Sequence, residues 1–334
     1  MRVTIEDIAR LAGVSKATVS RVLNNKSEGV GAETRKRVQK IINDHEYKPN
    51  LLARGIVTSK TKTLGLILPD ITNPFFPELI KAIEDNAHKN GYTVIIGNTD
   101  FSLEKEQNYI NTFIANRVDG VILTSTVDDN SAIHNKLKKY GVPCVLLDRA
   151  MKNMDYDAGV FFDNEYALYI SCEYLIKHGN KRIVLISGPP KISTSIERIE
   201  GYRMALTQYG LEHNKNLIKY GNFTIDSGYK AIKELHNEGV DFTAVLAAND
   251  IMAIGAIKAL KEIRYKIPDQ IEVIGFDNID FAEITDPPLS TIQQPTYEMG
   301  RKAVEFLLML MDGKTLNNKH IKLQPRLICR STTR

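Results

Sequence analysis

A chain of 334 residues is long enough for two or three domains, each with its own hydrophobic core. Its composition, 43% hydrophobic and 25% charged residues, is ordinary for a soluble globular protein. No apolar run approaches the length that spans a membrane, and the N-terminus carries no apolar signal segment, so a cytoplasmic location is expected. Cys144, Cys172 and Cys329 are odd in number and far apart, which argues against a disulfide framework or a shared metal site.

The net charge of +4 is unevenly distributed along the chain. Residues 1–60 contain 12 Lys and Arg against 6 Asp and Glu, whereas the remainder contains 32 against 34. A basic N-terminal segment on a slightly acidic body indicates that only this segment meets a polyanion.

The first predicted unit is a pair of short helices within TIEDIARLAGVSKATVSRVLN, residues 4–24. Thr4 and Asp7 have the spacing of a capping box, and Ser15 can cap the second helix. Gly13 between them can adopt the positive φ that ends a helix. Because the apolar residues of both helices recur at helical spacing while the second begins with polar ones, the pattern favours a helix-turn-helix over an unrelated hairpin. The second helix of such a unit enters the major groove of DNA.

A third predicted helix completes a DNA-binding headpiece over residues 1–48. The next segment, LLARGIV at 51–57, is short and contains Gly55, which weakens a helix by roughly 1 kcal/mol relative to alanine. Alone it should therefore be only marginally stable as a helix. The polar TSKTKT that follows has no periodicity, so residues 49–62 are assigned to a hinge helix and linker.

From Leu64 onward, apolar strand-like runs alternate with helical patterns. The alternation runs from LGLILP at 64–69 to PCVLLD at 143–148, and it begins again from KRIVLIS at 181–187 to EVIGFD at 272–277. Continuously apolar strands separated by helices indicate parallel sheets covered on both faces. Two such lobes predict a cleft, with ligand-binding groups at the carboxyl ends of the strands. The pattern alone leaves open the placement of LSTIQQP, the helix after it and IKLQPRLICR.

Motifs spread over essentially the whole chain point to one family. Besides residues 4–24, they are PNLLARG, DITNPFF, DGVIL, ERIEGY, ANDIMAIGA, VIGFDN and PLSTIQQP. With them the chain resembles the LacI family of bacterial transcription regulators, and LPDITNPFFPEL and the closing RSTTR make it most similar to ribose operon repressors.

The resemblance implies an all-α helix-turn-helix headpiece followed by a periplasmic-binding-protein-like α/β body of two parallel-sheet lobes over residues 63–334. It also implies that the chain crosses between the lobes near residues 160, 290 and 320. The N-terminal lobe would then contain 63–160 and 291–320, and the C-terminal lobe 161–290 and 321–334. A homodimer that reads a near-palindromic operator is expected, because no apolar heptad tail of the kind that makes tetramers in some family members follows the last strand.

The resemblance also divides the DNA-binding positions by task. Lys16 and Ala17 match the principal base-reading pair: a lysine donates to guanine O6 or N7, and an alanine methyl can contact thymine. The further candidates for base edges or phosphates are Thr18, Ser20, Arg21 and Asn24, and the positions that match phosphate contacts are Ser15, Tyr47 and Asn50. For Tyr47, packing beneath the headpiece is an equal alternative.

In the hinge segment, the resemblance places Ala53 and Arg54 at the DNA and gives Ile56 the role of an apolar wedge in the minor groove. The usual wedge is leucine, so the β-branched Ile56 leaves the depth of insertion and the preferred central base step open. A marginal helix is useful at this position, since its order can then depend on the geometry of the lobes.

The cleft is expected to bind a small polar effector, with a sugar such as ribose favoured. Carboxylates and amides pair with sugar hydroxyls, an arginine offers bidentate geometry, and aromatic faces cover C–H surfaces. The matching residues are Asp70, Phe75, Phe76, Asp148, Arg149, Arg198, Phe223, Asn249, Asp277 and Gln294. One of the two adjacent phenylalanines could simply be core. Asp163 and Asp250 each stand at the start of a helix, where a carboxylate can cap, so neither is assigned to the cleft.

An enzyme is not expected, and neither is a cofactor or a metal. The chain has no complete GxGxxG, no P-loop, no GxSxG and no CxxC, and its seven histidines lack metal-ligand spacing. The sequence therefore predicts a DNA-binding repressor controlled by a small effector. Two alternatives are a family member controlled by a partner protein and a sugar-binding protein with no DNA role. The basic headpiece argues against the second.

Overall fold

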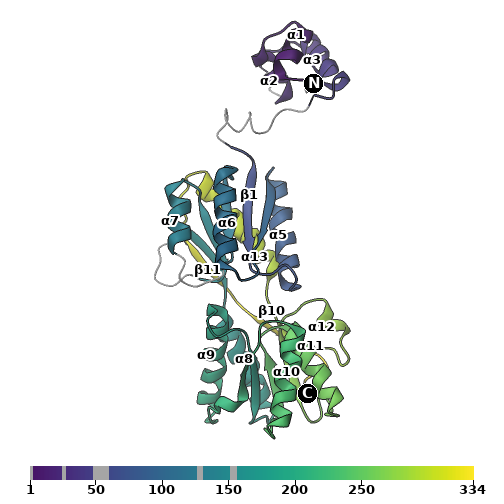
Figure 1. Ribbon diagram of the computed structural model, residues 1–334, viewed down its shortest axis with the longest axis vertical. Helices are drawn as coiled ribbons and strands as arrows, with labels where there is room; N and C mark the ends of the chain where they lie inside the picture. Colours follow the sequence, from purple (N-terminus) through teal and green to yellow (C-terminus); the bar gives the residue numbers. More distant parts are fainter. Residues whose placement is uncertain (1–2, 25–27, 48–59, 126–130, 151–155) are drawn as a thin grey trace. The chain divides into compact units, whose positions relative to one another are not determined.

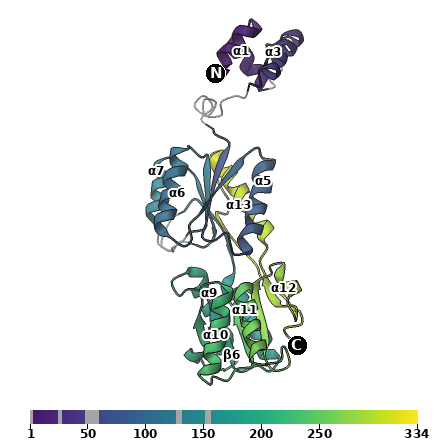
Figure 2. The same ribbon diagram turned by 45° about the vertical axis from the view of Figure 1, so that its right-hand side comes forward.

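The computed structural model of the chain describes residues 3–24, 28–47, 60–125, 131–150 and 156–334. The chain divides into two units, Met1–Thr61 and Lys62–Arg334. The first unit contains the headpiece, and the second contains two α/β lobes (Figures 1 and 2). Within the described ranges, no helix is both long enough and apolar enough to cross a membrane.

The headpiece is the predicted three-helix unit. Its helices are α1 (Ile5–Ala12), α2 (Lys16–Leu23) and α3 (Ala32–Asp44). Thr4 and Asp7 form the capping box of α1, with the Asp7 amide 3.3 Å from Thr4 Oγ1 and the Thr4 amide 3.0 Å from the Asp7 carboxylate. Gly13 ends α1 at a φ of 62°, the left-handed conformation that favours glycine. Apolar residues from all three helices, including Ile8, Val19 and Val38, bury together, so the headpiece has its own core.

The first lobe of the second unit contains a six-stranded sheet in the order β11-β5-β4-β3-β1-β2, with every pairing parallel. Its strands are β1 (Thr63–Leu68), β2 (Thr93–Asn98), β3 (Gly120–Leu123), β4 (Cys144–Asp148), β5 (Ala158–Phe162) and β11 (His320–Leu323). Its helices are α5 (Phe75–Lys89), α6 (Leu103–Ala115), α7 (Ser131–Lys139) and α13 (Thr296–Met311). Helices α5 and α13 cover one face and α6 and α7 the other (Figure 2).

The second lobe has a sheet in the order β12-β10-β9-β8-β6-β7, which is parallel except for the pair of β10 and β12. Its strands are β6 (Ile183–Ser187), β7 (Ile218–Tyr220), β8 (Ala244–Ala247), β9 (Glu272–Asp277), β10 (Ser290–Gln293) and β12 (Arg326–Ile328). Its helices are α8 (Asn164–Lys177), α9 (Ser193–Gln208), α10 (Ile225–Asn237), α11 (Asp250–Glu262), the short α12 (Phe281–Ile284) and the 3-10 turn η1 (Lys215–Leu217).

The central strands β6, β8 and β9 of this second sheet are buried on both faces, as their apolar runs predict. In β6, Ile183 and Leu185 pack toward α8 and α9, whereas Val184 and Ile186 pack toward α10 and α11. A strand that alternates between two helical layers must be apolar at every position, which explains the run IVLIS.

The three crossings between the lobes lie a few residues later than expected. Strand β5 ends at Phe162 and pairs with β4, and β11 pairs with β5, so both belong wholly to the first lobe. Strand β10 belongs to the second lobe. Pro295 and Pro325 follow β10 and β11 closely. Because proline has no amide to donate, each residue helps to end its ladder, and the run IKLQPRLICR is divided between the two sheets.

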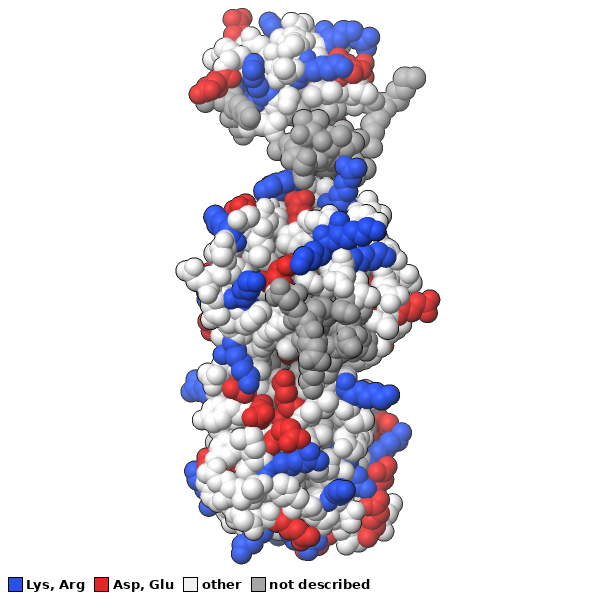
Figure 3. All heavy atoms as spheres, turned by 90° about the vertical axis from the view of Figure 1, so that its left-hand side faces the viewer, with Lys and Arg blue, Asp and Glu red and all other residues white. Residues whose placement is uncertain are grey.

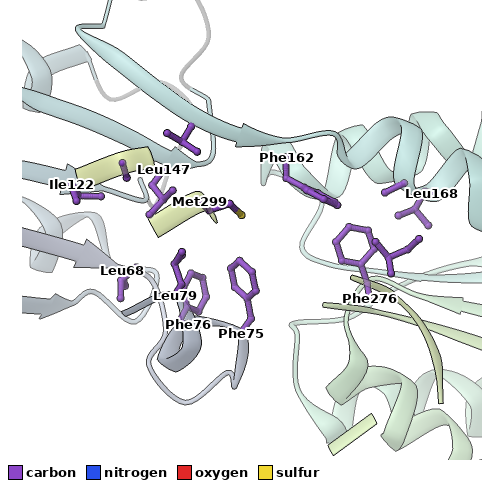
Figure 4. Packing of buried hydrophobic residues seen from close by; sticks show 14 of the residues in the cluster. Leu68, Phe75, Phe76, Leu79, Ile122, Leu147, Phe162, Leu168, Phe276 and Met299 are labelled. Carbon is purple, nitrogen blue, oxygen red and sulfur yellow. The ribbon is translucent and has the colours of Figure 1, made fainter. Parts of the chain in front are cut away.

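The two lobes share part of one hydrophobic cluster. Phe75 and Phe76 at the start of α5, Phe162 at the end of β5 and Phe276 in β9 are all buried in it (Figure 4). The rings of Phe162 and Phe276 meet edge to face with centroids 5.7 Å apart. Cys144 and Cys172 are buried free thiols, and Cys329 is an exposed one.

Candidate effector cleft and DNA-reading surface

One pocket lies between the two lobes, at the carboxyl ends of their strands. Asp148 is the last residue of β4 and Asp277 the last of β9, while Asn249 and Gln294 follow β8 and β10 closely. The pocket is lined by Asn73, Phe75, Phe76, Phe101, Asp148, Arg149, Thr194, Arg198, Phe223, Asn249, Asp277 and Gln294. Nine of the ten residues expected from the sequence are therefore brought together.

Asp70 is the exception, because it does not line this pocket. Its Oδ1 accepts hydrogen bonds from the amide of Thr72 (2.8 Å) and from the Thr72 hydroxyl (2.6 Å). An aspartate that accepts from the residue two positions later stabilises a turn. Asp70 thus shapes the loop between β1 and α5 and is not among the residues that line this pocket.

Two of the four phenylalanines that line the pocket, Phe75 and Phe76, stand at the start of α5. Asn73 accepts hydrogen bonds from the amides of Phe75 (side-chain Oδ1, 3.2 Å) and Phe76 (backbone oxygen, 3.0 Å). The two phenyl rings are edge to face with centroids 5.1 Å apart. Both rings are buried in the core and both line the pocket (Figure 4). Each phenylalanine can therefore serve both as a core residue and as a ligand contact.

Arg198 on α9 is held in place by contacts with three other segments of the second lobe. Its Nε donates to Asn164 Oδ1 at 2.9 Å and its Nη1 donates to the carbonyl oxygen of Ala248. Its guanidinium carbon lies 3.7 Å from the centroid of the Phe276 ring. Burial lowers the pKa of Arg198, and the nearby carboxyl of Asp277 opposes this shift. A guanidinium fixed in this way offers a preorganised donor to a ligand.

The two carboxyl groups of the pocket, those of Asp148 and Asp277, have different partners, but the pKa of each is raised. Burial raises the pKa of Asp277 well above its ordinary value, and burial likewise raises the pKa of Asp148. Gln294 Nε2 donates to Asp277 Oδ1 at 2.8 Å, while Arg149 Nε lies 3.7 Å from Asp148 Oδ2. Among the described residues, the buried Oε1 of Gln294 has no hydrogen-bond partner. Because this oxygen is already removed from water, a ligand hydroxyl that donates to it adds a hydrogen bond without a further desolvation cost for the oxygen.

Four lining residues other than glycine have positive φ angles. They are Phe101 (57°), Phe223 (63°), Asp148 (67°) and Asp277 (113°). Conformations of this kind cost free energy and persist where surrounding contacts impose them, which happens most often at ligand sites. Their concentration here supports a functional pocket.

Three lining residues were missed in the sequence. Asn73 lies inside the quoted motif DITNPFF and could have been included, whereas Phe101 and Thr194 lie outside every motif. Of the two expected helix caps, one is confirmed and one is not. Asp163 caps α8 through the Tyr166 amide (3.2 Å), but α11 is capped by Asn249, which accepts from the Met252 amide at 2.9 Å. Asp250 is therefore free for another role.

The expected base-reading residues lie on the exposed side of α2. Ser15 caps this helix through the Thr18 amide at 3.1 Å. Lys16 and Ala17 are exposed, and Lys16 forms an ion pair with Glu6 of α1. Basic side chains lie across the visible face of the headpiece in Figure 3. Arg21 and Asn24 are also exposed, and Thr18 and Ser20 are half-buried.

Tyr47 is half-buried against the headpiece core, and burial raises the pKa of its hydroxyl. This contact is the packing role that the sequence left as an alternative. The remaining expected DNA contacts lie outside the described residues, and they are Asn50, Ala53, Arg54 and Ile56.

Comparisons with known proteins agree with this two-part architecture. Residues 4–50 match the family described as bacterial regulatory proteins, lacI family. Residues 61–329 match the family described as periplasmic binding proteins and sugar binding domain of LacI family. Catabolite control protein A from Priestia megaterium is 36% identical over 335 residues and covers all of both chains.

Two solved structures of LacI-family regulators are similar to this chain. The lac repressor dimer bound to operator and the anti-inducer ONPF has a TM-score of 0.91 at 29% identity, over 100% of this chain and 99% of that one. A LacI family transcriptional regulator from Enterococcus faecium with bound ribose has a TM-score of 0.73 at 32% identity, over 81% of this chain and 98% of that one.

Proposed function

This chain belongs to the LacI family of DNA-binding transcriptional repressors controlled by small-molecule effectors, and from that premise we propose that its cleft binds a sugar, ribose being the first candidate. The observation that carries the proposal is that two carboxyl groups, two guanidinium groups, three side-chain amides and four phenyl rings line one interlobe pocket. The regulator from Enterococcus faecium with bound ribose supports the choice of ribose.

The chemistry of the pocket suits a polyhydroxylated ring. Asp277 and Gln294 offer acceptors and donors on one side, and Arg198 offers fixed N–H donors beside them. The phenyl rings of Phe75 and Phe76 present an apolar surface to ring C–H groups. Sugars need this combination, because their hydroxyl groups lie at the edge of the ring and their C–H groups on its faces.

A ligand in this pocket would touch both lobes. Phe75 and Asp148 come from the first lobe, whereas Arg198 and Asp277 come from the second. Binding would therefore favour one separation of the lobes over others, as any ligand shifts an equilibrium toward the state that it contacts better. We propose that this change acts through residues 49–62 on the DNA-binding headpiece.

On the DNA side, we propose that two copies of the chain bind a near-palindromic operator in the cytoplasm. Lys16 and Ala17 at the start of α2 would read base edges, and Ser15, Arg21 and Asn24 would contribute further contacts. Basic residues that neutralise phosphates release counterions, so operator affinity should fall steeply with salt concentration. An operator affinity independent of salt would contradict this assignment.

Thermal denaturation with a panel of D-ribose, D-glucose, their phosphates and purine bases tests the effector. A ligand at about 100 times its Kd stabilises a protein by about 2.7 kcal/mol. Stabilisation by ribose that disappears in Arg198→Ala, but persists in Arg203→Ala at a half-buried position of the same helix, supports the proposal. Stabilisation by purines alone would overturn the sugar assignment, and stabilisation by none of the panel would favour control by a partner protein.

A further inference from the structure

The turn that carries Asp277 into the cleft is held in a strained shape. Asp277 has a φ of 113° and Asn278 a φ of 57°, so two consecutive residues other than glycine lie in the left-handed region. Left unsupported, such a turn would relax and withdraw the carboxylate from the pocket. Contacts from two distant parts of the second lobe oppose this relaxation.

The first contact is the buried side chain of Asp250 at the start of α11. Its Oδ2 accepts the amide of Ile279 at 2.9 Å, and its Oδ1 accepts the hydroxyl of Thr291 at 2.6 Å. The same Thr291 oxygen accepts the amide of Asn278 at 3.3 Å. The Asp250 carboxylate thus fixes, directly and through one hydroxyl, the two amides that follow Asp277.

The space for this carboxylate depends on Gly275 in β9. A Cβ atom at this position would stand 2.2 Å from Asp250 Oδ1, closer than any real contact. The glycine in the motif VIGFDN therefore allows the side chain of α11 to reach the turn beyond the end of β9.

The second contact is Arg330, in the RSTTR segment that closes the chain. Its Nη2 donates to Asn278 Oδ1 at 2.8 Å and to Glu283 Oε1 at 2.9 Å, and its Nη1 donates to the carbonyl oxygen of Leu289 at 2.9 Å. Its own amide donates to Ser290 Oγ at 2.8 Å. The guanidinium therefore ties the side chain of the turn to the start of β10.

We propose that Asp250 and Arg330 are positioning residues for the effector site, which together hold the turn of residues 277–279 so that Asp277 faces the cleft. The inference rests on the proposed function only in taking Asp277 as an effector contact. Neither residue lines the pocket, so each acts through Asp277 and not by touching the ligand.

The contacts of Asp250 and Arg330 with the turn of residues 277–279 are called the clamp below. Hydrogen exchange of the full-length chain without ligand tests this clamp directly. The amides of Asn278 and Ile279 should exchange at least about tenfold faster in Asp250→Asn and in Arg330→Gln than in the parent, because the bonds that protect them are lost or weakened. Arg334→Gln is the matched control, since Arg334 belongs to the same segment but pairs with Glu272 at the opposite end of β9. Thr291→Val replaces Asp250→Asn if that variant does not fold.

Calorimetry with D-ribose then tests whether the clamp acts through Asp277. Asp250→Asn should weaken ribose binding about tenfold in the parent. In an Asp277→Asn background it should weaken binding less than about twofold, because the positioned carboxylate is already gone. Equal losses in both backgrounds, or unchanged exchange at residues 278–279, would overturn the proposal. If the parent does not bind ribose, the choice of effector fails while the exchange experiment still decides the clamp.

Discussion

The guanidinium of Arg198 stacks over the ring of Phe276, with 3.7 Å between its carbon and the ring centroid. The same guanidinium donates to Asn164 and to the carbonyl oxygen of Ala248. One side chain of α9 therefore joins α8, β9 and the end of β8 at the base of the cleft. This relationship makes the planar shape of Arg198 as important as its charge.

We expect Arg198→Lys to keep the charge but lose this geometry. The planar guanidinium donates to both Asn164 and Ala248, and the single ammonium group of a lysine cannot reach both. One buried acceptor is then left unpaired, at a cost of about 1–3 kcal/mol. Ribose affinity measured by calorimetry should fall at least about tenfold. Arg203→Lys is the control, because Arg203 is a half-buried residue of the same helix that pairs with Glu200, and it should leave ribose affinity unchanged. Ribose affinity unaltered by Arg198→Lys would contradict the assigned role.

The raised pKa of Asp277 predicts a pH-dependent effect of Asp277→Asn. Burial raises the pKa of this carboxyl above its unfolded value, so the folded protein binds more protons and loses stability as pH rises toward the folded pKa. Asparagine retains the acceptor for Gln294 without the charge. The free energy of unfolding at pH 8 should therefore be higher in Asp277→Asn than in the parent.

The same variant should gain less stability at pH 5.5, where more of the parent carboxyl is protonated. Urea denaturation at the two pH values measures both effects, and calorimetry should show ribose binding that is at least about tenfold weaker but still measurable. A gain that is larger at pH 5.5 than at pH 8 would show that the carboxyl is not stabilised in its neutral form.

In the headpiece, Lys16→Ala should weaken operator binding and relax its specificity. A lysine that donates to a base edge is worth about 1–3 kcal/mol of discrimination. Lys40→Ala removes the same charge from an exposed position on another helix, α3. Binding to a set of operator variants, measured at one salt concentration, separates the two. Lys40→Ala should lower all affinities uniformly or not at all, and a uniform loss with Lys16→Ala would limit that residue to phosphate contact.

The close packing of α10 on α11 predicts a large effect of Gly255→Ala. A Cβ atom at Gly255 would stand 2.0 Å from the carbonyl oxygen of Ile225 at the start of α10. The helices would have to separate, at a cost of about 1–3 kcal/mol. Lys258→Ala, at an exposed position of the same helix, should change the free energy of unfolding by less than about 0.5 kcal/mol. Chemical denaturation measures both, and equal effects would rule out the backbone contact as the cause.

Much of the candidate site could be predicted because it lies in motifs with a definite place along the fold. Asp148 and Asp277 end apolar strands, and the carboxyl ends of parallel strands are where such sheets bind ligands. Asp70 also follows an apolar strand, yet its carboxylate is used by Thr72 two residues away. Sequence position therefore located the edge of the sheet correctly, but it did not reveal which carboxylates at that edge already had partners.

The sequence by itself determined the features that depend on neighbouring residues. The capping box of Thr4 and Asp7, the left-handed Gly13 and the apolar runs of the strands follow from interactions within a few positions, so they could be read directly. Only the tertiary structure decided the role of Asp250, which looked like a helix cap and instead holds the turn beyond Asp277 with the help of Arg330. The physical reason is separation along the chain: the partners of these side chains lie tens of residues away, and no local pattern encodes such contacts.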